Sequence, residues 1–248
     1  MKKFNLYLLL LVLAFTPVLQ SCLDDNDGYS LGNYTVALAT VKTDAGNSVY
    51  FVLDNGETLW PAASFVSYNG LENGTRIIGN FTFLSDAQNG FDHYVRLNDY
   101  SKVLTKNIIN LTEANKDSIG DDPVRVTDLW RSGNYINVEF DMNLPSAQKH
   151  RVNLVRNTMK EYPDDGYTYY EFRYNDMNDI TDYIGHSLVS FWLGDLELMN
   201  MTPDFKGWKI RINSVVNGEK IIVIDYKTKQ QRAVSVESIT NDTSGKMN

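Results

Sequence analysis

Apolar and polar residues alternate along most of the chain from residue 33 onward, which is the pattern of half-buried β-strands. The segments Tyr34–Val41 and Val49–Leu53 show this alternation clearly. Asn55-Gly56 follows the second of them and favours a tight hairpin, because Asn and Gly accept positive φ angles. About five closely spaced strands predict a small closed barrel of the OB type over residues 33–115. The strands expected in it include 34–41, 49–53, 76–84 and 93–103.

The second half of the chain keeps the same period of two residues. Within Tyr135–Met142, the even-numbered residues are apolar and most of the intervening ones are polar. Strands of this kind, with one face toward water, predict an antiparallel β-sandwich over residues 120–237. Residues 113–123 are expected to be a linker with one short helical turn. The fold class is therefore all-β, and the expected sandwich strands are 135–142, 151–156, 167–174, 187–193, 208–213 and 220–226.

The first residues follow a different pattern. Lys2 and Lys3 precede an almost wholly apolar run, Leu6–Leu19, that contains no charge. A helix that crosses a bilayer needs about 20 apolar residues, so this shorter run is typical of a signal-peptide core. The segment that follows it, Leu19-Gln20-Ser21-Cys22, resembles the lipobox of lipoprotein precursors. Residues 1–21 are therefore predicted to be a lipoprotein signal peptide.

Cys22 is the only cysteine of the chain. Exported proteins usually carry cysteines in pairs or have none, so a lone cysteine directly after an apolar core is better explained as a lipid anchor. The alternative is an ordinary signal peptide with an incidental thiol beside it. Two or three acyl chains on Cys22 would hold the protein at a membrane, since one chain binds only marginally. We predict an exported outer-membrane lipoprotein that is exposed at the cell surface.

Two short segments at the ends are expected to lack regular structure. Residues 22–32 form an acidic, flexible tether that includes Asp24, Asp25 and Asp27. The tether resembles the acidic export signal of surface lipoproteins in some Gram-negative gut and oral bacteria, and the alternative is a solvated spacer. Residues 238–248 are rich in Ser, Thr, Asn and Asp, and we expect a frayed tail there.

The charge balance bears on the class of ligand. Removal of residues 1–21 leaves 21 basic and 31 acidic residues. Within residues 34–104, the expected barrel, there are four basic and seven acidic residues. OB barrels that bind single-stranded nucleic acid need a basic groove beside exposed aromatic rings. An acidic barrel therefore argues against nucleic acid as a partner.

Two stretches give the chain a resemblance to a known family. One is Gly74–Phe81, and the other is Leu129–Phe140, in which Trp130, Ser132 and Gly133 precede Tyr135-Ile136-Asn137. Together with the lipobox, these stretches resemble the NigD-like lipoproteins, although Ile136 replaces the more usual Leu. The resemblance implies an N-terminal OB domain and a C-terminal β-sandwich. It also suggests a link to bacteriocin production or immunity, and it implies no catalytic residues.

The sequence carries no recognisable catalytic motif. His93, His150 and His186 lie far apart, and none has a second ligand at the spacing of a zinc site. With Cys22 lipidated, no thiol nucleophile remains, and neither a Gly-x-Ser-x-Gly elbow nor a phosphate-binding Gly-rich loop is present. A Ser-His-Asp triad assembled in space stays open. We therefore predict no catalytic, metal or cofactor site and a protein that is not an enzyme.

One aromatic strand is a candidate binding surface. Tyr167 and Tyr169 are expected on the face of 167–174 that does not enter the core, where they offer a platform for a sugar ring or a partner protein. The alternative is cross-strand aromatic pairing that only steadies the sheet. The following loop, Asn175–Asp179, is a weaker candidate for calcium.

These observations favour a non-enzymatic binding or interaction protein tethered at the envelope surface. Its expected partners are the membrane, through the lipid, and a protein or a glycan. Two alternatives stay open. One is an envelope hydrolase that acts on polysaccharide or peptide, and the other is a bacteriocin-associated accessory or immunity lipoprotein.

Overall fold

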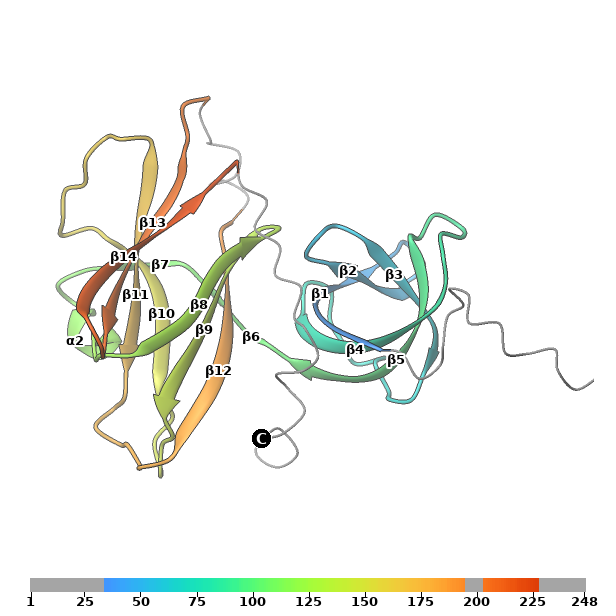
Figure 1. The fold of residues 1–248 in the computed structure, drawn as a ribbon, viewed down its shortest axis with the longest axis horizontal. Helices are drawn as coiled ribbons and strands as arrows, with labels where there is room; N and C mark the ends of the chain where they lie inside the picture. Colours follow the sequence, from blue (N-terminus) through green and yellow to red (C-terminus); the bar gives the residue numbers. More distant parts are fainter. Residues whose placement is uncertain (1–33, 195–202, 228–248) are drawn as a thin grey trace, which may run out of the picture.

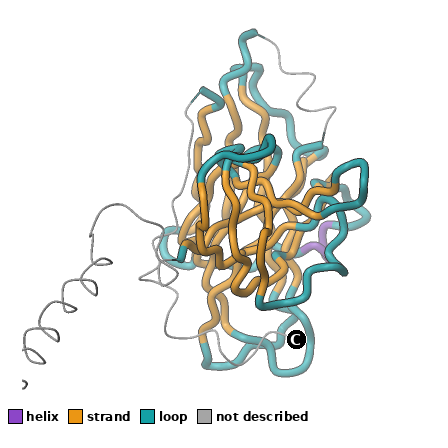
Figure 2. Tube along the Cα trace, turned by 90° about the vertical axis from the view of Figure 1, so that its right-hand side faces the viewer, coloured by secondary structure: helices purple, strands orange, loops and turns teal. Residues whose placement is uncertain are grey.

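The computed structural model describes residues 34–194 and 203–227, and nearly all of their regular structure is β (Figures 1 and 2). The expected all-β fold class is confirmed. Within these residues, no helix has the length and apolar character needed to cross a membrane. The predicted signal peptide (1–21), Cys22 with the tether (22–32), and the tail (238–248) lie outside the described residues.

The first five strands close into a barrel in the order β1-β2-β3-β5-β4. Neighbours pair antiparallel except β3 and β5, which run parallel. This is a five-stranded barrel of the OB type, as the alternation predicted. The strands are β1 (Thr35–Thr43), β2 (Val49–Leu53), β3 (Thr58–Ser64), β4 (Arg76–Ser85) and β5 (His93–Lys102).

The barrel interior is filled by every second side chain of its strands. Phe51 and Leu59, which are paired across β2 and β3, are both fully buried. Phe81 lies beside Phe51, with the ring centroids 5.5 Å apart. A Cβ atom at residue 79 would lie 2.3 Å from the Phe81 ring. Glycine at this position therefore leaves room for the ring to pack over the backbone of the strand. The inward set leaves the alternate residues of β2 and β3 on the outside of the barrel.

The second lobe is a β-sandwich of a five-stranded sheet, β14-β13-β11-β10-β7, and a four-stranded sheet, β6-β12-β9-β8. Its core lies between the sheets and includes Trp208, Phe172 and Phe191. The strands are β6 (Leu104–Asn107), β7 (Ile109–Leu111), β8 (Arg125–Ser132), β9 (Tyr135–Asn143), β10 (Arg151–Asn157), β11 (Tyr167–Asn175), β12 (Ile184–Trp192), β13 (Gly207–Ser214) and β14 (Gly218–Asp225).

The sandwich differs from the expected antiparallel arrangement in three of its pairs. β6 runs parallel to β12, β7 runs parallel to β10, and β11 runs parallel to β13. The sheets are therefore mixed. Alternation reports which residues are buried, but it carries no information on strand direction.

The boundary between the lobes lies before β6 and β7, which is earlier in the chain than the sequence predicted. Both lie inside the range 33–115 that was expected for the barrel, yet each pairs with a strand of the sandwich. The chain leaves the barrel at Lys102 and immediately supplies an edge strand to each sandwich sheet. The segment 113–123 contains a short helix, α2 (Lys116–Ile119), as expected, and Ile119 packs with Leu111 and Val155.

A buried arginine joins the two lobes. Arg76 begins β4 and is only 1% exposed, and its guanidinium forms two hydrogen bonds with the Asp54 carboxylate, at 2.5 and 3.0 Å. On the sandwich side, the guanidinium lies 4.5 Å from the centroid of the Tyr135 ring and donates to Asn137 Oδ1 at 3.3 Å. The two sequence stretches that carried the family resemblance therefore meet at the junction between barrel and sandwich.

Candidate ligand-binding site

The outer surface of β2 and β3 carries a cluster of aromatic rings. Tyr50 and Trp60 belong to the outward set of these strands, because Phe51 and Leu59 face the core. Phe91, from the β4–β5 loop, packs against both rings, with centroid distances of 5.4 Å to Tyr50 and 4.9 Å to Trp60. OB proteins bind oligonucleotides and oligosaccharides on this face, between the β1–β2 and β4–β5 loops.

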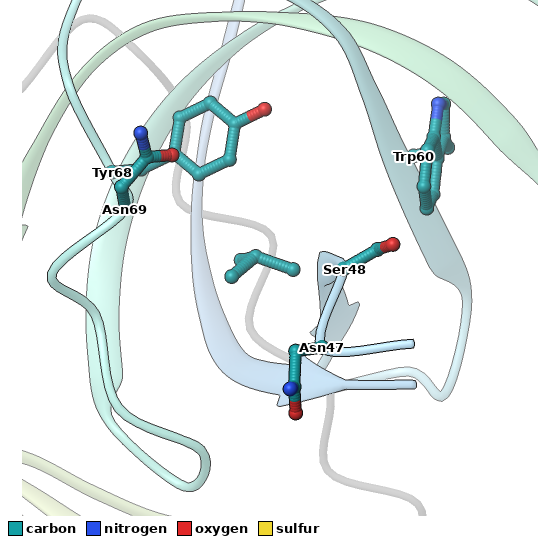
Figure 3. Close-up of a pocket in the computed structure, with 6 residues that line it drawn as sticks. Asn47, Ser48, Trp60, Tyr68 and Asn69 are labelled. Atoms are coloured by element: carbon teal, nitrogen blue, oxygen red, sulfur yellow. The ribbon is translucent and has the colours of Figure 1, made fainter. Parts of the chain in front are cut away.

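A hollow of about 340 Å³ opens beside this aromatic cluster (Figure 3). Three segments that are far apart in the sequence line it: the β1–β2 turn with the start of β2, the strand β3, and the β3–β4 loop. Trp60 and Tyr68 stand on opposite sides, with Ser48 between them (Figure 3). The lining residues are Asn47, Ser48, Val49, Trp60, Tyr68 and Asn69.

Local hydrogen bonds and core packing fix the rim of the hollow. Asp44 Oδ1 accepts the backbone N–H groups of Gly46 and Ser48, each at 2.8 Å, which closes the β1–β2 turn. The Tyr68 ring packs edge-on against buried Phe51, with the centroids 6.1 Å apart. These contacts are internal to the protein, so little ordering of the rim is needed when a ligand binds.

The chemistry of the lining is aromatic and polar but uncharged. Trp60 and Tyr68 supply ring surface, and Asn47, Ser48 and Asn69 supply amide and hydroxyl groups that both donate and accept hydrogen bonds. Such a surface suits an uncharged ligand with its own hydroxyl or amide groups. None of the six lining residues is a carboxylate, a histidine or a cysteine.

The predicted platform residues Tyr167 and Tyr169 lie on the outer face of the five-stranded sheet, opposite the buried Tyr170, Phe172 and Tyr174. Their rings already have partners within the chain. Tyr162 stacks on Tyr169 with the centroids 4.6 Å apart, and Lys209 Nζ lies 4.6 Å from the Tyr167 centroid and 5.1 Å from that of Tyr169. The Tyr169 hydroxyl donates to Asp165 Oδ2 at 2.7 Å. Ligand binding by this pair stays a prediction.

Glu171 is the most deeply buried carboxylate on the same face, with 1% exposure. Its Oε1 accepts hydrogen bonds from Asn157 Nδ2 at 2.9 Å and from the Tyr162 hydroxyl at 3.1 Å, while Oε2 is paired with Arg173. Burial raises the pKa of Glu171, but the hydrogen bond from Asn157 and the contacts with Arg173 outweigh it and lower the pKa to about 2. A carboxylate held ionised in this way is a poor general acid for a hydrolase.

The histidines occupy three separate places. His93 packs against the Phe83 ring, and His186 Nδ1 lies 2.8 Å from Asp141 Oδ1. His150 bridges the Tyr174 hydroxyl and the Asp179 carbonyl oxygen, at 2.5 and 2.7 Å. No contact between a histidine and a serine hydroxyl is present among the described residues, and none of their His, Cys, Asp and Glu side chains gather in groups of three or more that could hold a metal ion.

In the loop Asn175–Asp179, which was a candidate for calcium, the carboxylate of Asp179 is occupied by hydrogen bonds within the protein. Asp179 accepts backbone N–H groups of Gln148, Ala147 and Ser146 from the β9–β10 loop. These hydrogen bonds, with that of Gln148 the largest contribution, hold the pKa of Asp179 well below its usual range. Within the loop, Asp176 Oδ1 accepts the backbone N–H of Asn178 at 2.8 Å. The acidic residues of 175–179 therefore order a turn and tie two loops together.

Two family models match most of the chain. The NigD-like N-terminal OB domain matches residues 38–103, and the NigD-like C-terminal beta sandwich domain matches residues 107–226. These ranges agree with the end of the barrel at Lys102 and with the sandwich pairing of β7. No protein of curated function matches the chain.

Solved structures from Bacteroides and Parabacteroides species share both lobes. A protein of unknown function from Bacteroides vulgatus is 40% identical, with a TM-score of 0.73 and coverage of 79% of this chain and 92% of that one. A toxin-related protein from Parabacteroides distasonis is 28% identical, with a TM-score of 0.63 and coverage of 78% and 93%. A NigD-like immunity protein from Bacteroides caccae, 16% identical with a TM-score of 0.54 and coverage of 78% and 93%, shares the fold. The chain therefore belongs to the NigD-like family, with an N-terminal OB domain followed by a C-terminal β-sandwich.

Proposed function

We propose that this protein is a non-enzymatic binding protein, held at the outer membrane by lipid on Cys22, that takes its ligand on the outer face of the barrel. The observation that carries the proposal is the hollow beside Trp60, in which two aromatic rings stand next to amide and hydroxyl groups. The ligand is a glycan or a partner protein, because the acidic barrel disfavours nucleic acid.

The binding proposal is tested by affinity capture. The bait is the mature chain with Cys22→Ser, which carries no lipid, and a second bait also carries Trp60→Ala. Both are exposed to solubilised outer membranes and to the glycans released from them. We expect at least one ligand to be retained by the first bait and lost from the second. Identical eluates from the two baits would refute binding on the barrel face.

The anchor is tested in the full-length chain by Cys22→Ser. We expect the protein to leave the membrane pellet and appear in the soluble fraction, because Cys22 is the only thiol that could carry the acyl chains. The matched control is Ser21→Ala, which keeps a small residue before the cleavage site and is expected to stay in the pellet. Mass spectrometry of the native protein gives the decisive result, since a first residue other than acylated cysteine would rule the anchor out.

An immunity or accessory role in bacteriocin biology is the second candidate. It is favoured by the description of one relative as an immunity protein and of another as toxin-related. A binding protein at the cell surface could serve such a role by intercepting a toxin. A deletion strain should then show changed bacteriocin sensitivity or output, and unchanged values for both would remove this candidate.

A further inference from the structure

We infer that the hollow between the β1–β2 turn and the β3–β4 loop is a saccharide site that takes an uncharged sugar ring against Trp60. This inference rests on the proposed function and narrows its ligand from a glycan or protein to a neutral glycan. The aromatic surface, the polar rim and the charge of the lining all support it.

The aromatic surface is held in place by a contact within the protein. Phe91 packs against Trp60 at 4.9 Å, and its interplanar angle of 40° leaves the two rings tilted rather than stacked. Trp60 is half-buried, and the part of it that Phe91 does not cover lines the hollow. Pyranose rings bear C–H groups on one face, and an immobile indole gives such a face a large apolar contact at low entropic cost.

The polar rim matches the hydroxyl groups at the edge of a sugar. Asn69 is exposed, and Ser48 lies near Trp60 with its hydroxyl directed toward that side of the hollow (Figure 3). Amide and hydroxyl groups donate and accept hydrogen bonds, as sugar hydroxyls do. A hollow of about 340 Å³ is of the size that small ligands occupy, whereas stable protein interfaces cover about 800 Å² on each partner.

The charge of the lining selects against acidic ligands. None of the six lining residues is ionised, so a phosphate or carboxylate placed here would lose its hydration without gaining an ion pair. The acid nearest in sequence, Asp44, closes the adjacent turn and adds negative charge to the rim. Lys42 is paired in register with Tyr50, so a base lies on the strand next to the aromatic cluster. Neutral hexose units therefore suit the hollow better than uronic acids or nucleotides.

The test is calorimetric titration of the mature Cys22→Ser chain with neutral gluco-, manno- and galacto-oligosaccharides and with matched oligosaccharides that contain uronic acids. We expect at least one neutral oligosaccharide to bind, and Trp60→Ala to weaken it about tenfold or more. Asn69→Ala removes an exposed amide from the rim and leaves the barrel core intact, and it should weaken binding several-fold. Weaker binding by this folded variant would show that the loss in Trp60→Ala is not caused by misfolding. Phe65→Ala is the matched control, because Phe65 is 71% exposed, packs on Arg96 and does not line the hollow.

The outcomes separate this inference from the proposed function. Stronger binding of uronic acids, or neutral binding that is unchanged by both Trp60→Ala and Asn69→Ala, would overturn the saccharide assignment. If no oligosaccharide binds but a captured protein still depends on Trp60, the saccharide inference fails and the proposed binding function stands. If neither a sugar nor a protein depends on Trp60, both fail.

Discussion

Replacing Arg76 with Met is expected to lower the free energy of unfolding by about 3 kcal/mol, because removal of one partner from a buried ion pair leaves the other uncompensated. The Asp54 carboxylate is 19% exposed, which keeps the loss at the low end of the usual range for such pairs. The same substitution removes a hydrogen bond to Thr40 within the barrel and one to Asn137 in the sandwich. The loss is measured by urea unfolding followed by tryptophan fluorescence.

The junction gives the Arg76→Met variant a second readout. Asn137 is fully buried, accepts a hydrogen bond from Ser190 Oγ at 2.7 Å and donates one to Ser132 Oγ at 2.6 Å, so Arg76 is attached to an ordered network in the sandwich. Without Arg76, we expect the two lobes to change their relative orientation, which small-angle scattering detects as a broader distance distribution. Lys102→Met, an exposed base on β5, is the control and should stay within about 0.5 kcal/mol of the wild type. An Arg76→Met variant as stable as this control would show that the junction does not depend on the arginine.

The position of Arg76 also explains why the family resemblance is visible in these two stretches. Arg76 comes from the first stretch, and Ser132, Tyr135 and Asn137 come from the second. Each of them contacts Arg76 or supports a residue that does. The recognisable residues therefore hold the two lobes together and do not line the hollow on the barrel face.

Much of the fold could be predicted from the sequence because half-buried strands show their period of two directly. The inward face of 135–142 is one example, since Ile136, Val138 and Phe140 are buried as the alternation predicted. Strand direction could not be predicted, and the parallel β6–β12 and β7–β10 pairs depend on where the chain returns after long connections. The edge strands β6 and β7 are also too short to show a clear period of their own.

The candidate site was harder to predict than the fold. Alternation identified the outer face of β11, but it could not show that Tyr162 and Lys209 cover the ring of Tyr169. The hollow on the barrel draws its residues from three separate segments, and Asn69-Gly70 reads in the sequence only as a turn. The sequence offered one indication of this site, which is Trp60 beside Pro61 in the strand β3. An aromatic residue that faces outward on β3 of an OB barrel lies on the face where such barrels bind ligands.

The polar face of the five-stranded sheet contains a charge network that supports the second large effect. Arg173 pairs with Glu171 and also with Asp121 Oδ2 at 3.1 Å, and Arg211 reaches the other oxygen of Asp121 at 2.6 Å. Lys160 Nζ lies 3.4 Å from Glu171 Oε1. Of the two carboxylates in this network, Asp121 is 30% exposed and Glu171 is 1% exposed. Water therefore screens the charge of Glu171 less than that of Asp121.

Replacing Glu171 with Gln is expected to lower the free energy of unfolding by about 3 kcal/mol at pH 7, since lowering a pKa from the ordinary 4.5 to about 2 corresponds to that amount. The folded-state pKa is below the unfolded one, so this stabilisation is fully present above pH 4.5 and is lost as the pH falls toward 2. The difference between wild type and Glu171→Gln should therefore shrink to roughly half by pH 3 in urea unfolding measured across this range. Glu219→Gln, the same substitution at a carboxylate that is 60% exposed and paired with Arg211, is the control and should change stability little at any pH. A constant difference between pH 7 and pH 3 would mean that Glu171 acts through packing and hydrogen bonding, and not through its charge.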